Sequence, residues 1–289
     1  MERNANSRSL SLKLDIGGRA FHIDRTSPYR LLKLEGTEAG DYSIYLGENA
    51  YMDGGFLQGQ KVEPRSIRLT FEASVWQSTE KLRGELIESL RPKSKGRLTI
   101  SRGDVTRAID FYIAGRPKFI QKNIYDFLRV DLDLLCPDPY FTDPNEKQER
   151  FLRVLPVYSA PLSTYRGGGT VAGLFTRSDS VKLVNSGHAD IGVVAEIFAE
   201  HGDIINPRVS AGSQEIKVLQ TIPLGARLAI STVKGEKSIL LDGEPVSSFD
   251  RKSIFFQLPP GEHQISISAD SGSESAFTTL SYRLKYLGV

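Results

Sequence analysis

Few residues of this 289-residue chain have the types and spacing that catalysis or metal binding needs. The four histidines, His22, His188, His201 and His263, are scattered, and no two share the short spacing at which a helix or hairpin presents metal ligands. Structural or solvated histidines are therefore the better interpretation. We expect no catalytic residue, no cofactor and no metal, and hence a protein that is not an enzyme.

Three other patterns have both a chemical and a simpler interpretation. The glycines at 167–169 lack the Lys-Ser/Thr that follows in a phosphate-binding loop, so a linker is favoured. Residues 102–104 spell the integrin-binding tripeptide Arg-Gly-Asp, but they lie where a hairpin turn is expected. Asp131 and Asp133 could form a carboxylate pair, although an exposed or interface face that also holds Arg129 explains them more simply.

The single cysteine begins the most informative segment, Cys136-Pro137-Asp138-Pro139-Tyr140-Phe141. A residue before proline favours extended backbone, and proline cannot donate to a β-ladder, so a strand must end here. The strand is visible upstream, where apolar and charged residues alternate: Leu128, Val130, Leu132 and Leu134 against Arg129, Asp131 and Asp133. We interpret the segment as a rigid exit from one domain, with Cys136 buried and structural.

Composition limits the classes of protein that fit. The length suggests about two domains, and 39% hydrophobic with 25% charged residues allows each a core. A net charge of +2 does not indicate nucleic-acid binding, and one cysteine excludes a disulfide framework. We find no signal peptide and no run of about 20 apolar residues, so we expect a soluble protein without membrane insertion, made in a reducing cytoplasm.

The first half predicts a mainly β domain with one helix, at residues 1–141. Leu10–Ile16 and Phe21–Ile23 flank Gly17-Gly18 as a hairpin, and Arg65–Ala73 alternates as a strand. A helix is expected at about 79–91, with a core face of Leu82, Leu86, Ile87 and Leu90. Residues 142–170, which are charged and then rich in proline and glycine, are interpreted as a junction.

The remainder, residues 171–289, reads as all β. Asp242-Gly243 is a tight-turn signal, and short strands at such spacing predict an antiparallel sandwich or jelly roll. The expected strands are Val181–Val184, Val193–Ala199, Pro207–Val209, Glu215–Leu219, Arg227–Thr232, Ser238–Leu241, Ile254–Leu258, Gln264–Ala269 and Leu280–Tyr286.

Together these motifs resemble the distal tail (Dit) proteins of long non-contractile-tailed phages and prophages. The segment at 136–141 resembles that family's strand exit. Their order and spacing carry the resemblance over nearly the whole chain, with further matching segments at 65–71, 90–100, 111–119, 184–187, 205–209, 238–246 and 253–265. The chain has no room for the inserted carbohydrate-binding modules of some longer family members.

The resemblance implies a structural protein of the virion tail tip, made in the bacterial host cytoplasm. Its first domain, β-barrel- or sandwich-like, would form a hexameric ring, and its second would be a galectin-like β-sandwich outside that ring. Implied partners are the tail tube protein, the tail-tip hub or tail-associated lysin protein, and receptor-binding proteins, with no specific nucleic-acid binding. The strand face of Arg129, Asp131 and Asp133 is our candidate subunit interface.

Two alternatives remain open at this stage. A galectin-like sandwich can bind sugars, so a carbohydrate-binding module for host-surface adhesion is the second reading. It requires a row of exposed aromatic side chains on one sheet face. A hydrolase has the least support, because no pairing of nucleophile and base is visible.

Overall fold

The computed structural model describes residues 10–48, 51, 53–73, 79–91, 93–121, 123, 126–156, 173–177, 179–273 and 276–289. The chain divides into two compact units. The N-terminal unit consists of Met1–Pro144 together with Lys285–Val289, and the C-terminal unit consists of Asn145–Leu284. The chain therefore leaves its first unit, builds the second, and returns to the first. We call Lys285–Val289 the return segment.

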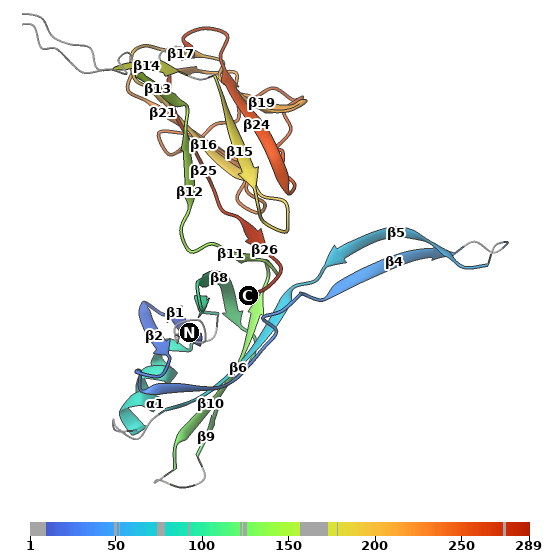
Figure 1. Ribbon diagram of the computed structural model, residues 1–289, viewed down its shortest axis with the longest axis vertical. Coiled ribbons are helices and arrows are strands. Elements are labelled where there is room, and N and C mark those ends of the chain that lie inside the picture. Colours follow the sequence, from blue (N-terminus) through green and yellow to red (C-terminus); the bar gives the residue numbers. More distant parts are fainter. Residues whose placement is uncertain are drawn as a thin grey trace, which may run out of the picture. The chain divides into compact units, whose positions relative to one another are not determined.

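The N-terminal unit is built on one closed sheet (Figure 1). Seven strands follow one another in the order β8-β7-β1-β2-β3-β6-β10, and β10 pairs again with β8 to close a barrel-like ring. Strand β9 extends the sheet beyond β10, while β11 and β26 extend it beyond β8. The strands are β1 Leu10–Ile16, β2 Arg19–Ile23, β3 Tyr29–Glu35, β6 Arg65–Ala73, β7 Lys95–Arg102, β8 Val105–Ile113, β9 Lys118–Ile120, β10 Leu128–Cys136, β11 Phe141–Thr142 and β26 Lys285–Tyr286.

Local sequence signals explain much of this sheet. Gly17 and Gly18 both have positive φ, at 60° and 77°, which is the backbone that a two-residue hairpin turn requires between β1 and β2. Gly103, at φ 61°, forms the turn between β7 and β8, so the Arg-Gly-Asp tripeptide is a hairpin turn as expected. Strand β10 ends at Cys136, where the prolines begin.

The single helix of the described residues, α1 (Thr79–Ser89), covers the core with Leu82 and Leu86. Leu90 is also buried, just after the helix ends. The predicted core role of Ile87 is wrong, because its side chain is 53% exposed. Ile87 lies about 100° around the helix from Leu86, which turns it away from the sheet.

The barrel encloses a continuous apolar core to which nearly every strand contributes. Leu14, Leu69, Phe71, Leu98 and Phe111 are fully buried within it. Cys136 belongs to the same core and is a free, buried thiol, as expected. Burial raises the pKa of Cys136 to about 12, although the nearby Arg65 guanidinium acts in the opposite direction.

One element of the N-terminal unit does not join the barrel. Strands β4 (Tyr42–Glu48) and β5 (Gly55–Val62) pair only with each other and form a two-stranded sheet. Figure 1 shows this pair projecting from the rest of the unit between β3 and β6. We call β4 and β5 the arm. The sequence analysis predicted neither the arm nor β3.

The C-terminal unit contains two principal antiparallel sheets, each with one buried face. One has six strands in the order β12-β25-β16-β21-β22-β23, and the other has four in the order β15-β24-β18-β19. Two further pairs, β13–β14 and β17–β20, complete it. The strands are β12 Lys147–Arg150, β13 Leu152–Pro156, β14 Gly173–Arg177, β15 Ser180–Asn185, β16 Val193–Ala199, β17 Ile204–Ile205, β18 Arg208–Ala211, β19 Gln214–Lys217, β20 Thr221–Ile222, β21 Arg227–Ser231, β22 Ser238–Leu241, β23 Glu244–Pro245, β24 Gly261–Ser268 and β25 Ala276–Tyr282.

Two strand predictions in this unit need correction. Ile254–Leu258 forms no strand, since only Leu258 makes an isolated bridge, to Ile191. Phe256 and Leu258 are nevertheless buried, so the alternation that suggested a strand comes from packing without a ladder. The expected strand Leu280–Tyr286 is also split, because β25 ends at Tyr282 and β26 pairs with β11 in the N-terminal unit.

The predicted fold class is confirmed: the chain is mainly β, with a barrel-like first unit, one helix and a two-sheet second unit. Asp242 and Gly243 both have positive φ and form the predicted turn between β22 and β23. Among the described residues, no helix has the length and apolar character that crossing a membrane requires. The glycines at 167–169 lie outside the described residues.

The buried thiol gives a first prediction. In the native protein at pH 8, Cys136 should not react with a thiol reagent such as DTNB, and it should react at once in guanidinium chloride. The folded-state pKa of Cys136 is raised, so its contribution to stability is present below the unfolded thiol's pKa of about 8.5 and is lost as pH rises toward about 12. Labelling of the native protein at the unfolded rate would contradict the buried position.

Candidate functional site

A buried arginine gathers four separate chain segments of the N-terminal unit. Arg65, at the start of β6, is only 3% exposed. Its Nε donates to the Pro139 carbonyl at 2.8 Å, and its Nη2 donates to the Leu287 carbonyl at 2.6 Å. Its Nη1 donates to the carbonyls of Gly36 and Glu38, at 2.8 and 2.5 Å. We call these five residues the Arg65 junction.

The electrostatics of the Arg65 junction are unusual because the acceptors that face the guanidinium in the described residues are backbone carbonyls. Carbonyl dipoles accept from all three guanidinium nitrogens, and the Phe141 ring lies 5.0 Å from the central carbon, Cζ. Burial lowers the pKa of Arg65, while Cys136 and Asp41 raise it by smaller amounts. An arginine keeps its proton in proteins, so the junction holds a buried positive charge solvated by main-chain oxygens.

The return segment makes two further sets of contacts in the same unit. The Arg107 guanidinium stacks 3.5 Å from the centre of the Tyr286 ring and donates to Asp143, and the Tyr286 hydroxyl lies 3.3 Å from the other oxygen of Asp143. Lys285 bonds to the carboxylate of Asp138 at 2.7 Å. These contacts hold β26 beside β11, where Phe141 pairs with Tyr286.

The predicted motif residues thus meet partners that the sequence analysis did not name. Cys136 and Phe141 are buried, the Pro139 carbonyl accepts from Arg65, and Lys285 lies 5.6 Å from the Tyr140 ring. Pro137 is exposed, and the Asp138 carboxylate accepts from the Tyr140 amide as well as from Lys285. The sequence does contain a signal that Arg65 is buried: it lies two residues before Ile67 and four before Leu69, and so shares the inward face of β6 with them.

The arm carries an apolar stripe on one face. Residues directly opposite in an antiparallel pair point to the same side, so the register Tyr42↔Val62, Ile44↔Gln60 and Leu46↔Leu57 defines that face. Tyr42 is 68% exposed, Ile44 53%, Leu46 62% and Leu57 59%. We call these four residues the arm stripe. On the other face the Phe56 ring covers Gly47, where a Cβ atom would collide with it.

The predicted interface residues lie together on the outward face of β10. Asp133 pairs with Arg68 of β6 at 2.9 Å, and Arg129 pairs with Asp131 at 3.1 Å. Leu135 continues the same face, is 39% exposed and stands opposite Tyr112 of β8, which is 41% exposed. We call the outward face of β10 with Tyr112 the β10 face: a charged row that ends in an apolar pair.

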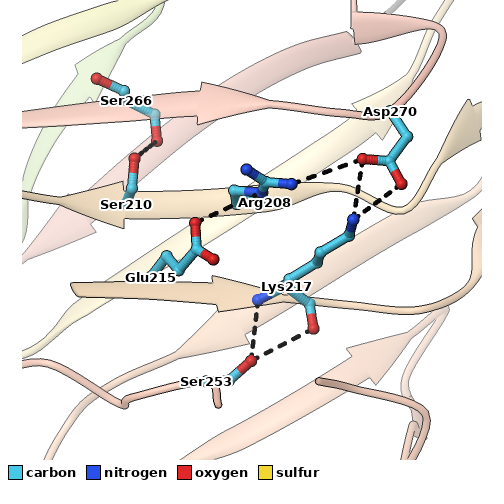
Figure 2. Close-up of polar contacts among 7 residues, drawn as sticks. All are labelled: Arg208, Ser210, Glu215, Lys217, Ser253, Ser266 and Asp270. Carbon is cyan, nitrogen blue, oxygen red and sulfur yellow. Dashed lines mark hydrogen bonds and ion pairs between the residues drawn. The ribbon is translucent and has the colours of Figure 1, made fainter. Parts of the chain in front are cut away.

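The outer side of the four-stranded sheet in the C-terminal unit is polar (Figure 2). Asp270 accepts from Lys217 at 2.9–3.0 Å and lies 3.6 Å from Arg208, and Arg208 lies 3.5 Å from Glu215. Lys217, with Asn206 and Arg208, lowers the pKa of Asp270. The Ser253 hydroxyl bonds to both the amide and the carbonyl of Lys217.

This polar side does not meet the requirement set for a sugar-stacking platform. Of the large hydrophobic side chains described as exposed in the C-terminal unit, Phe249 alone is aromatic, at 37%. It contacts Phe255 edge to face and lies on the segment after β23, where it bridges to Val218. Within the described part of the chain, no group of three or more His, Cys, Asp and Glu side chains is placed to bind a metal ion.

Comparisons with known proteins give a family match for part of the chain and a fold match for nearly all of it. Residues 186–286 match the family model of the siphovirus-type tail component, C-terminal domain. No curated protein sequence matches the chain.

Among solved structures, the SPP1 Dit (gp 19.1) protein, described as a paradigm of hub adsorption apparatus in Gram-positive infecting phages, matches with a TM-score of 0.66. The identity is 14%, and the alignment covers 95% of this chain and 98% of that one. Chains of the phage P2 baseplate, activated with Ca or Sr, match with TM-scores of 0.53 and 0.54 at 10% identity, over 97% of this chain and 99% of theirs.

A tail component is a structural part of a virion, so the match over residues 186–286 bears out the expectation of a non-enzymatic protein. Residues 186–286 thus match the C-terminal domain of siphovirus-type tail components, and the chain as a whole has the fold of the SPP1 Dit protein.

Proposed function

We propose that this protein is the hub of a phage tail tip. Six copies form a ring that joins the tail tube to the tail-tip (tail-associated lysin) protein, and the C-terminal units anchor receptor-binding proteins. The observation that carries this proposal is the likeness to SPP1 Dit over 95% of the chain, together with the tail-component model over residues 186–286.

The arm stripe supports self-association in physical terms. An isolated two-stranded sheet is at best marginally stable in water, yet the arm exposes Tyr42, Ile44, Leu46 and Leu57 along one face. Burying one such side chain is worth about 1.5–3 kcal/mol. We take a second copy of this chain as the occupant, because a ring supplies a neighbour at the same place for every arm.

The β10 face supplies a second, different surface for that contact. It lies on the barrel, whereas the arm projects from it (Figure 1). A contact between two different surfaces is heterologous, and heterologous contacts close into rings when the rotation between subunits allows it. We propose that the apolar pair Leu135–Tyr112 receives apolar surface from the neighbour, while Arg129, Asp131 and Asp133 fix the register.

Purified protein should therefore form rings that contain six copies of the 32.0-kDa chain, visible by negative-stain electron microscopy and by mass photometry. Replacing Leu46→Ser and Leu57→Ser together should raise the subunit dissociation constant by about 100-fold, since about 3 kcal/mol of burial is lost. Ile87→Ser is the matched control, because Ile87 is similarly exposed but lies on α1. A persistent monomer at high concentration, or equal effects of arm and control variants, would contradict the arm as interface.

The charged row gives a separate prediction. Asp131→Lys with Asp133→Lys should weaken ring assembly by about tenfold, because like charges then meet across the contact. Asp15→Lys is the control: Asp15 pairs with Lys13 two residues away on β1, as Asp131 pairs with Arg129 on β10. Unchanged ring mass for the β10 variant in light scattering would remove the charged row from the interface.

A further inference from the structure

The root of the arm is held by contacts that do not belong to the arm itself. The chain turns out of β3 at Gly36, whose φ is 81° and whose Cβ, if present, would lie 2.2 Å from the Ser66 carbonyl. It re-enters the barrel at Arg65, and Arg65 bonds back to Gly36 and Glu38. The Glu63 amide donates to the Asp41 carbonyl at 2.9 Å and closes the arm at its base.

The return segment also contacts the root of the arm, through its backbone. The Val289 amide donates to the Thr37 carbonyl at 3.1 Å, and the Leu287 carbonyl accepts from Arg65. Gly288 lies so close that an added Cβ would stand 3.0 Å from the Thr37 oxygen and from the Glu38 carbonyl carbon. Thr37 is only 5% exposed, so the loop is packed against the unit at this residue.

The return segment is also joined to the C-terminal unit with almost no slack. Only Arg283 and Leu284 separate the end of β25 from Lys285, and two residues span at most about 7 Å. Lys285 and Tyr286 are themselves fixed to Asp138, Asp143 and Arg107. The return segment is therefore fixed within the N-terminal unit from its first two residues onward.

We propose that the return segment and Arg65 form a strap that sets the direction of the arm and thereby controls ring assembly. The strap deepens the hub function proposed above and rests on it, because the arm is taken there as the subunit contact. Arg65 and Gly288 are then positioning residues: they touch the root, and the arm stripe touches the neighbour.

The test measures the arm root by hydrogen exchange and mass spectrometry, at a concentration where mass photometry shows monomer. Gly288→Val should crowd the 37–38 loop and speed exchange of the Glu63 amide and the β4–β5 ladder by about tenfold, with peptides of the C-terminal unit unchanged. Gly115→Val is the control, since a Cβ there meets nothing within 4 Å. Arg65→Lys should act like Gly288→Val, because an ammonium cannot reach four carbonyls, whereas Arg68→Lys should not.

The outcomes separate the strap from the hub. Faster exchange at the arm root together with weaker ring assembly in Gly288→Val supports the strap as a positioning device. Unchanged exchange in both Gly288→Val and Arg65→Lys overturns it, whatever the oligomer. If the unmodified chain forms no ring, the hub proposal fails, while the exchange data still decide whether the strap holds the arm. Uniformly faster exchange across both units would mean general unfolding and would also count against a local strap.

Discussion

The N-terminal unit depends on one buried positive charge. A guanidinium is costly to remove from water, and Arg65 offsets that cost with four main-chain carbonyls. Each hydrogen bond to a charged group is worth about 1.5–3 kcal/mol, but only while its acceptor stays in place. The charge therefore obliges the loop after β3, the exit after β10 and the return segment to converge on β6. Chain positions as distant as 36 and 287 are fixed together by this requirement.

The N-terminal unit also contains a part whose strands are paired, the barrel, and a part whose strands have unpaired edges, the arm. The barrel pairs its strands around a closed circuit, and its remaining edge strands, β9 and β26, are only three and two residues long. Both strands of the arm have an unpaired edge, and they expose the apolar side chains of Tyr42, Leu46 and Leu57. The unpaired backbone and the exposed side chains thus both favour the arm as the contact with a neighbouring subunit, and the Arg65 junction lies at the base of the arm.

Sequence patterns could predict the elements whose two faces differ. β10 alternates strictly and β6 does so except at the buried Thr70, so their inward residues follow from period two, and paired glycines mark the first hairpin. The arm gives no such signal, because Tyr42 and Ile44 lie on one face and Tyr45 and Phe56 on the other, and all four are exposed. Alternation arises where one face of a strand meets the core and the other meets solvent. Both faces of the arm are exposed within a single chain, so no alternation arises there.

The return segment escaped prediction for a different reason. Leu280–Tyr286 reads as one continuous strand, but its first part pairs with β16 and its last two residues pair with β11. Periodicity shows which side of a strand is buried and says nothing of which sheet receives it. The same limit applies to Arg65. Alternation along β6 shows that its side chain points inward, but its acceptors are backbone oxygens, and these cannot be recognised from residue types. What the sequence leaves open is therefore the set of long-range main-chain contacts.

The polar network of the C-terminal unit bears on the choice between sugar binding and protein anchoring. On the outer side of its four-stranded sheet, Lys217 and Arg208 share Asp270, and Lys182 pairs with Glu262. These cations are already neutralised within the chain, so the face offers little attraction for an acidic glycan. Its described side chains also include no exposed aromatic ring on which a neutral sugar could stack. A surface of this kind suits a partner that brings its own hydrogen-bonding groups in a fixed arrangement, as another folded protein does, which agrees with the anchoring role proposed for this unit.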